Sequence, residues 1–273
     1  MTHPAHWLLL DGMLAVLAAW IVIGLAGIAA LRRLAFVARV LFPLGGLFGL
    51  ALAALALAAV FGGPQVAVLV LGLPGLPFHL RLDGLAAYFL FVIGAVAAGV
   101  SAFAAGYFRK GEGTPPGLLC LEYHVFLASM VLVVLADDAY AFMVAWETMA
   151  LASYFLVTAN HRIGEVRSAG YLYLTLAHIG AIAILLCFGV LQAQSGDYTF
   201  ANLRAQSLTP FWGAVAFGLA LLGNEELPYY VLIDQHGVVR GTSPDFDIET
   251  ELLRMGYRPK PPATPTPAPR KPN

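Results

Sequence analysis

Six apolar stretches of the chain are each long enough to cross a bilayer as a helix, which takes about 20 mostly apolar residues. They cover residues 8–31, 40–61, 84–108, 118–136, 140–159 and 169–193. The composition agrees, because only 11% of the residues are charged, whereas soluble domains carry about 25%. The sequence therefore predicts an all-α polytopic membrane protein with about six transmembrane helices, and not a soluble enzyme.

Two other segments interrupt or shorten this pattern. Residues 62–82 hold Gly63-Pro64 and Pro74-Gly75 around a short apolar stretch, which is typical of a strand or hairpin outside the bilayer. Asp83 then stands where an N-cap is expected for the third long run. A seventh run, 211–223, has only thirteen residues and is too short to span. We expect a truncated seventh helix here.

The composition changes after residue 223, where acidic and basic residues become frequent. Residues 229–240 resemble two strands around a turn, and 246–255 could form a short helix. From 259 to 273, Pro recurs every few residues, which favours an extended, disordered end. The sequence thus divides into a transmembrane domain (1–223), a short soluble segment with a hairpin and a helix (224–258), and a Pro-rich tail (259–273). The C-terminal part is expected to be α/β-like or disordered.

Lys and Arg concentrate in alternate loops. Seven lie in the first, third and fifth loops: Arg32, Arg33, Arg39, Arg109, Lys110, Arg162 and Arg167. The second and sixth loops hold only Arg81 and Arg204. Because cytoplasmic loops carry the excess of positive charge, we expect a multi-pass protein of the inner (plasma) membrane with its N-terminus outside and its tail in the cytoplasm. The first seven residues lack Lys and Arg, so the first run does not resemble a signal peptide.

Several classes of function find no support in the sequence. A net charge of −1 gives no case for nucleic-acid binding. No phosphate-binding Gly loop and no paired-His metal motif occurs. Cys120 and Cys187 lie far apart within apolar runs, and two cysteines cannot hold an iron–sulfur cluster that needs four ligands. We therefore expect no cofactor, no metal and no catalytic redox site in this chain, so that any redox centre would sit in a partner protein.

Glu147 is the most informative residue, because it lies deep in the apolar fifth run. A carboxylate in hydrocarbon is costly unless it is paired, hydrated or protonated, and burial moves a carboxyl group toward the range in which protons are exchanged. We interpret Glu147 as a proton-relay site. The alternative is a structural glutamate that a neighbouring helix satisfies.

A polar stripe in the sixth run gives a second candidate. Tyr171, Thr175 and His178 fall at i, i+4 and i+7, which places them on one face of a helix. Histidine titrates near neutral pH and suits proton transfer, so His178 and Thr175 could pair with Glu147 or line a water path. A buried core histidine without a transport role is the alternative.

Two further groups of titratable residues lie near the ends of the fourth run. Glu122, Tyr123 and His124 stand close to its predicted cytoplasmic start. Glu122 and His124 could feed protons inward, although an interfacial position favours solvated side chains. Asp137-Asp138 follow the other end and are expected in a solvated turn.

Particular segments of residues 1–223 resemble a known family. They are Arg81-Leu-Asp-Gly-Leu-Ala-Ala-Tyr-Phe89, the run from Phe126 to Asp138, and above all Ala145-Trp-Glu-Thr-Met-Ala-Leu-Ala-Ser-Tyr-Phe-Leu-Val157, with Tyr171 to Gly180 fitting as well. These residues are similar to the N-terminal half of the antiporter-like membrane subunits of respiratory complex I and its relatives. The likeness is greatest to the large membrane component of hydrogenase-4, component B, and to its formate hydrogenlyase equivalent.

The resemblance implies quinone- or hydrogenase-linked proton pumping, with redox centres in other membrane and peripheral subunits. It makes Glu147 the key acid of a proton channel and His178 a residue that couples neighbouring units. The family continues with a lysine in a broken seventh helix, an eighth helix and a second inverted half, which is where such sites are usually built. No lysine occurs in any span of this chain, which puts a complete pump in doubt.

Other readings remain open. A component of a multi-component sodium/proton antiporter would share the same ancestry. A non-functional truncated fusion product is the third reading, because the segment from Leu227 to Arg240 is weakly similar to a strand-turn-strand element of thioredoxin-like proteins, without their CxxC. The sequence does not distinguish proton from sodium or name the electron donor.

Overall fold

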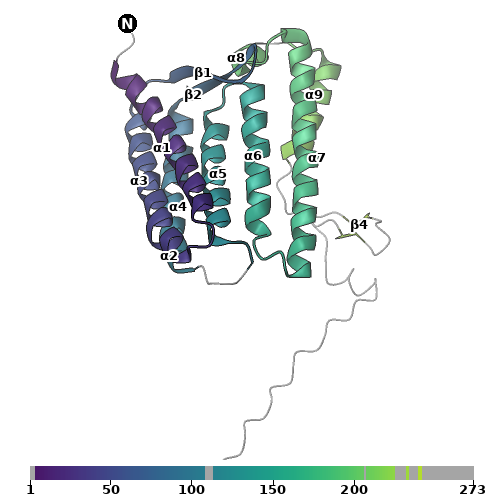
Figure 1. Cartoon of the computed structure of the whole chain (residues 1–273). Coiled ribbons are helices and arrows are strands. Elements are labelled where there is room, and N and C mark those ends of the chain that lie inside the picture. The colour runs from purple at the N-terminus through teal and green to yellow at the C-terminus, as the bar shows by residue number, and fades with distance from the viewer. Residues whose placement is uncertain (1–3, 108–112, 206, 225–231, 234–238, 242–273) are drawn as a thin grey trace, which may run out of the picture. The chain divides into compact units, whose positions relative to one another are not determined.

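The computed structural model describes residues 4–107, 113–205, 207–224, 232–233 and 239–241. The chain forms two units, residues 1–224 and residues 225–273. The first unit is mostly helical (Figure 1). Its helices are α1 Pro4–Ala29, α2 Leu34–Phe36, α3 Phe42–Val60, α4 Gly84–Tyr107, α5 Pro116–Leu135, α6 Ala139–Val157, α7 Gly164–Ser195, α8 Phe200–Arg204 and α9 Pro210–Asn224. A π-helical turn, η1, covers Val37–Leu41 between α2 and α3.

Six of these segments are long and apolar enough to cross a membrane: α1, α2 through α3, α4, α5, α6 and α7. The prediction of about six transmembrane helices is confirmed. α9 is apolar but has 15 residues, which agrees with the short seventh helix expected from the sequence. The chain is therefore a multi-pass membrane protein.

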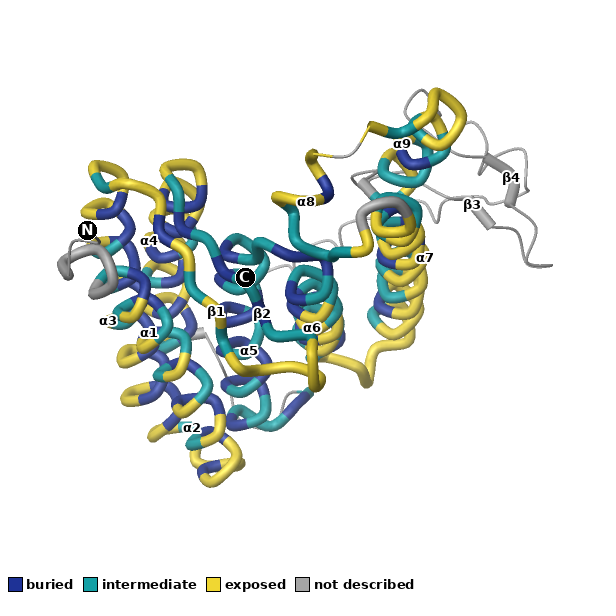
Figure 2. Tube along the Cα trace, turned by 90° about the horizontal axis from the view of Figure 1, so that it is seen from above, coloured by how far each residue is buried: buried dark blue, intermediate teal, exposed yellow. Residues whose placement is uncertain are grey.

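The helices are arranged as a cluster followed by a row, as seen from above in Figure 2. α1, α3 and α4 gather on one side of α5, and α6 and α7 continue from its other side. α9 packs against α7. α5 is thus bordered by α1, α4, α6 and η1, whereas α6 and α7 leave broad faces open in this chain. The buried core accordingly lies around α1, α3, α4 and α5.

Small residues bring the helices of the cluster close together. A Cβ atom added to Gly94 on α4 would lie 2.6 Å from the carbonyl oxygen of Gly49 on α3. A Cβ atom on Gly27 of α1 would lie 2.6 Å from the carbonyl oxygen of Gly117 on α5. Close backbone approach through small residues is a common way for membrane helices to associate, because lipid leaves no hydrophobic force between them.

A β-hairpin joins α3 to α4, as the sequence predicted for residues 62–82. β1 Gln65–Leu73 pairs antiparallel with β2 Leu76–Leu82 through a turn at Pro74-Gly75. Leu80 and Leu82 are buried against the helices, whereas Val68 and Val70 are exposed. Asp83 then accepts a hydrogen bond from the Ala86 amide at 3.0 Å, which confirms it as an N-cap.

In the second unit, β3 Leu232–Ile233 pairs antiparallel with β4 Val239–Gly241. The helix expected over 246–255 and the Pro-rich segment 259–273 lie outside the described residues.

Candidate functional site

The structure brings Glu147 and His178 together on neighbouring helices. Glu147 lies eight residues after the start of α6, about 12 Å along its axis, and is therefore near the middle of this span. His178 lies near the middle of α7. The Nε2 atom of His178 is 3.5 Å from Oε2 of Glu147. The pairing of these two residues, one of the arrangements left open by the sequence, is thus present.

Hydrogen bonding defines which nitrogen of His178 faces the acid. Nδ1 lies 3.0 Å from the carbonyl oxygen of Leu174. A carbonyl oxygen only accepts, so Nδ1 carries a hydrogen and donates it. The remaining nitrogen, Nε2, is the one directed at Glu147. An unprotonated Nε2 and a carboxylate would place lone pairs against each other, so this arrangement requires a proton on one of the two groups.

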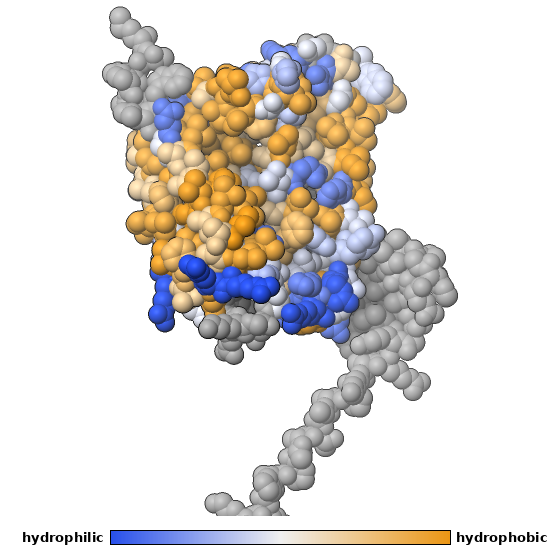
Figure 3. Space-filling view, viewed as in Figure 1, coloured by the Kyte–Doolittle hydropathy of each residue, from blue (hydrophilic) through white to orange (hydrophobic). Residues whose placement is uncertain are grey.

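The pair lies on the surface of this chain. The side chain of Glu147 is 39% exposed and that of His178 is 48% exposed. In Figure 3 a broad hydrophobic band is interrupted by a hydrophilic patch at mid-height over α6 and α7. An ionisable group facing hydrocarbon costs on the order of 3 kcal/mol or more. This face is therefore suited to water or to another protein surface, and not to lipid.

Thr175 lies on the same face of α7 but does not join the pair. Its hydroxyl donates to the Tyr171 carbonyl oxygen at 2.9 Å, and both residues are exposed. The predicted polar stripe Tyr171, Thr175 and His178 therefore exists as a polar surface. Among the described contacts, only His178 reaches Glu147.

A second link between α6 and α7 was missed by sequence reasoning. The Ser153 hydroxyl on α6 lies 2.6 Å from the Tyr173 hydroxyl on α7. Both residues stand in apolar surroundings in the sequence, where Ser and Tyr are ordinary, so only the packing of the two helices reveals the bond. It fastens together the two helices that carry Glu147 and His178.

Glu122 and His124 are buried, and this corrects the solvated, interfacial position favoured from the sequence. Glu122 is 8% exposed and His124 is 0% exposed. The sequence placed them correctly near one end of α5, but this helix is bordered by neighbours on several sides. Nearness to a helix end therefore does not bring these side chains into water.

His124 is wedged between helices. Its Nδ1 donates to the Cys120 carbonyl oxygen at 2.7 Å, which leaves Nε2 as an acceptor. Nε2 has no hydrogen-bond partner and presses against Gly45, where a Cβ atom would collide with it. A protonated Nε2 would lack an acceptor, so this geometry favours the neutral ring. His124 consequently suits packing better than proton transfer.

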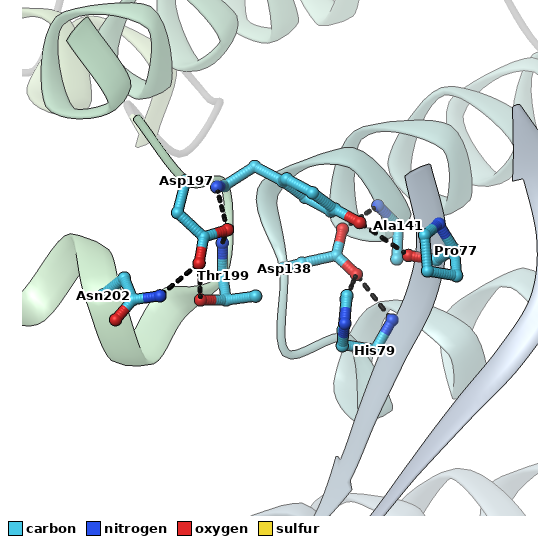
Figure 4. A network of polar contacts seen from close by, with 8 residues as sticks. Pro77, His79, Asp138, Ala141, Asp197, Thr199 and Asn202 are labelled. Atoms are coloured by element: carbon cyan, nitrogen blue, oxygen red, sulfur yellow. Dashed lines mark hydrogen bonds and ion pairs between the residues drawn. The ribbon is translucent and has the colours of Figure 1, made fainter. Parts of the chain in front are cut away.

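Asp138 is buried too, which corrects the expectation of a solvated Asp137-Asp138 turn. Figure 4 shows its carboxylate between His79 of β2 and the first turn of α6. Oδ2 accepts from the backbone N–H of His79 at 2.6 Å and lies 3.1 Å from its Nδ1. Oδ1 accepts from the Ala141 amide at 2.6 Å. Asp138 therefore caps α6 and also ties the hairpin to it.

The loop after α7 completes this outer network. The Ala139 amide donates to the Tyr198 carbonyl oxygen at 3.0 Å, and the Tyr198 hydroxyl donates to the Pro77 carbonyl oxygen at 3.2 Å. Burial, followed by the charges of Asp138 and Asp197, raises the pKa of Tyr198. Hydrogen bonds, first of all from the Thr199 amide, lower the pKa of Asp197. The three segments at this end thus form one connected cap.

Across the described ranges, no group of three or more His, Cys, Asp and Glu side chains could hold a metal ion. The titratable residues are instead distributed as separate pairs and single groups. The arrangement at Glu147 and His178 can accept, share and release a proton, which is the simplest chemistry that it supports.

Comparison with known proteins connects this fold to membrane complexes. Hydrogenase-4 component B of Escherichia coli is 35% identical over 144 residues, which cover 53% of this chain and 21% of that protein. The A/B polypeptide of a probable K⁺/H⁺ antiporter of Rhizobium meliloti is 29% identical over 153 residues (55% and 15%). The L polypeptide of the NADH-quinone oxidoreductase of E. coli is 27% identical over 126 residues (46% and 20%). No family model matches the chain.

Solved structures show the same fold. A chain of the Mrp complex from a Dietzia species superposes with a TM-score of 0.63 and 25% identity, covering 77% of this chain and 23% of that one. A chain of respiratory complex I from Thermus thermophilus gives 0.57 and 24%, covering 77% and 42%. The present chain matches only about a fifth of hydrogenase-4 component B. Its transmembrane part is nonetheless a homologue of the antiporter-like membrane subunits of hydrogenase-4, Mrp and complex I assemblies.

Proposed function

We propose that this chain is a membrane subunit of a hydrogenase-4-like or complex I-like assembly and contributes to proton translocation coupled to electron transfer. The contact between Glu147 and His178 carries the proposal, because it is an ionisable pair at mid-depth of two adjacent spans. Intramembrane ionisable residues commonly mark proton or ion pathways.

The pair has two forms of nearly the same geometry. In one, Glu147 is a carboxylate and His178 an imidazolium, and in the other Glu147 carries the proton and Nε2 accepts it. Nδ1 keeps its hydrogen bond to Leu174 in both forms. A proton can therefore move between the two residues without turning the ring, and leave from either one. Thr175 extends the polar surface along which water could reach His178.

The exposed pair needs partners to cover it. An uncovered Glu147 and His178 would face hydrocarbon at high cost, whereas a second membrane protein of the assembly would enclose them with water. The solved chains of similar fold come from Mrp and complex I assemblies. We propose other membrane and peripheral redox subunits as partners, and these would hold the redox centres.

The distribution of arginines supports an orientation. The segments between α1 and α2 and between α6 and α7 hold Arg32, Arg33 and Arg162 at one end of the bundle, which we call the arginine-bearing end. We propose that this end faces the cytoplasm of an inner (plasma) membrane, that the N-terminus lies outside, and that residues after α9 are cytoplasmic. Labelling of single cysteines from one side of intact cells tests the assignment.

Proton movement in membrane vesicles tests the function. Glu147→Gln in the assembled complex should abolish proton translocation while the complex still forms. Glu165→Gln, which changes an exposed acid at the start of α7, is the matched control and should leave translocation unchanged. Wild-type proton movement in the Glu147→Gln complex would refute the proposal.

The similarity to an Mrp complex and to a polypeptide of a probable K⁺/H⁺ antiporter favours a multi-component cation/proton antiporter as the second candidate. This assembly would exchange a cation for protons without a redox partner. Cation-dependent proton movement in vesicles that lack an electron donor would select it over the redox-coupled assembly.

A further inference from the structure

α5 directs three consecutive polar residues into the protein. Glu122, Tyr123 and His124 are all buried, although consecutive residues of a helix point about 100° apart. Only a helix with neighbours on several sides can bury all three, and α5 packs against α1, α4, α6 and η1. A lipid-facing helix would have left one of them on the membrane side.

Two of the three residues have a structural explanation. The Tyr123 hydroxyl lies 3.2 Å from Ser101 Oγ and donates to the Ala97 carbonyl oxygen at 3.2 Å, which ties α5 to α4. His124 is the neutral wedge against Gly45 described above. Glu122 has no comparable explanation.

The carboxyl group of Glu122 has a buried oxygen, Oε2, without a hydrogen-bond partner. No ion pair of the described residues includes Glu122. This holds for the charged and histidine side chains on the elements packed against α5, namely Asp11, Arg39, His79, Arg81 and Glu147. An unpaired buried carboxylate is strongly disfavoured, and such a group takes up a proton instead.

The depth of Glu122 sets it apart from a residue of the interface. It lies six residues after Pro116, the first residue of α5, or about 9 Å from the arginine-bearing end. Glu147 lies ten residues before Val157, the last residue of α6, or about 15 Å from the same end. α5 and α6 are neighbours, so Glu122 is the shallower of two acids on adjacent spans.

We propose that Glu122 is a second proton-binding site of this chain, located inside the helix bundle between the arginine-bearing end and the depth of Glu147. A proton from water at that end binds to Oε2 and converts the carboxylate to the neutral acid, and its release restores the carboxylate. The binding site stands on its own geometry. Its use in transport rests on the function proposed for Glu147 and His178.

Infrared difference spectroscopy of the full chain in lipid bilayers tests the site. A protonated carboxylic acid gives a carbonyl stretch that is separate from the amide and carboxylate bands. At neutral pH the wild-type chain should show such a band from Glu122. Glu122→Gln should remove it, and Glu122→Asp should keep an acid band at a shifted position. The aspartate variant guards against a spectrum that changes only because the chain misfolds.

Glu147→Gln separates this inference from the proposed function. It should leave the Glu122 band in place whether or not it stops proton translocation, so the two proposals are scored by different signals. Glu165→Gln, at the exposed start of α7, should leave the band unchanged. A neutral-pH band that survives Glu122→Gln, or the absence of any protonated-acid band, would overturn the assignment.

Discussion

Replacing Asp138 with Ala should destabilise the protein far more than replacing its neighbour Asp137. Asp138 is fully buried and accepts hydrogen bonds from the Ala141 amide and the His79 amide. Loss of an N-cap costs about 0.5–2 kcal/mol, and an unsatisfied amide at His79 costs about 1–3 kcal/mol. Together these effects predict about 2–5 kcal/mol for Asp138→Ala.

Asp137 provides the matched control. Its carboxylate is 3.9 Å from the guanidinium of Arg204, which is 66% exposed, and a solvated pair of this kind contributes about 0–1 kcal/mol. Its structural contacts use the backbone, since its amide donates to the His79 carbonyl oxygen at 2.8 Å. Asp137→Ala should therefore cost less than about 1 kcal/mol.

Asp138→Asn separates the two roles of Asp138. Asparagine is a good N-cap, so Oδ1 can still accept from Ala141, but the amide group cannot replace the carboxylate beside His79. The cost should fall between those of the two alanine variants. Reversible unfolding of the full chain in mixed micelles measures all three. Equal destabilisation by Asp137→Ala and Asp138→Ala would refute the reasoning.

Three other perturbations follow from individual contacts. Gly45→Ala should cost about 1–3 kcal/mol of stability, because its Cβ atom collides with His124 Nε2; adding His124→Ala should restore part of it in a double-mutant cycle. Ser153→Ala should cost about 1 kcal/mol through loss of the bond to Tyr173, measured by the same unfolding. Because the pKa of Asp197 is lowered, its contribution is complete above its ordinary pKa of about 3.9 and is lost as pH falls through the lowered value. Hydrogen exchange around residues 197–202 should therefore be constant from neutral pH to about pH 4 and rise only below it.

The transmembrane helices were predictable because the bilayer requires a length and an apolar character that the sequence shows directly. Their ends were less so. The second run was expected from residue 40, whereas the helical backbone already begins at Leu34 and passes Arg39 in a π-turn. The sixth run was expected from residue 169, but α7 begins at Gly164 and includes Arg167. Charged residues end an apolar pattern without ending a helix.

Which polar residues meet was only partly predictable. The stripe on the sixth run and the acid on the fifth suggested the contact between His178 and Glu147, because adjacent spans joined by a short loop pack as antiparallel neighbours. The burial of Asp138 had no local signal, since its partner His79 lies 59 residues away. The burial of Glu122 depends on how many helices surround α5, and hydropathy along one helix does not contain that number.

The most direct test of the account is the protonation of His178 in the bilayer. Nitrogen NMR of the full chain, with the His178 signals identified by their loss in His178→Gln, reports each ring nitrogen separately. The structure predicts that Nδ1 stays protonated across the pH range and that the Nε2 signal changes when Glu147 is replaced with Gln. An Nδ1 without its proton, or an Nε2 signal that is insensitive to Glu147→Gln, would contradict a proton shared between these two residues.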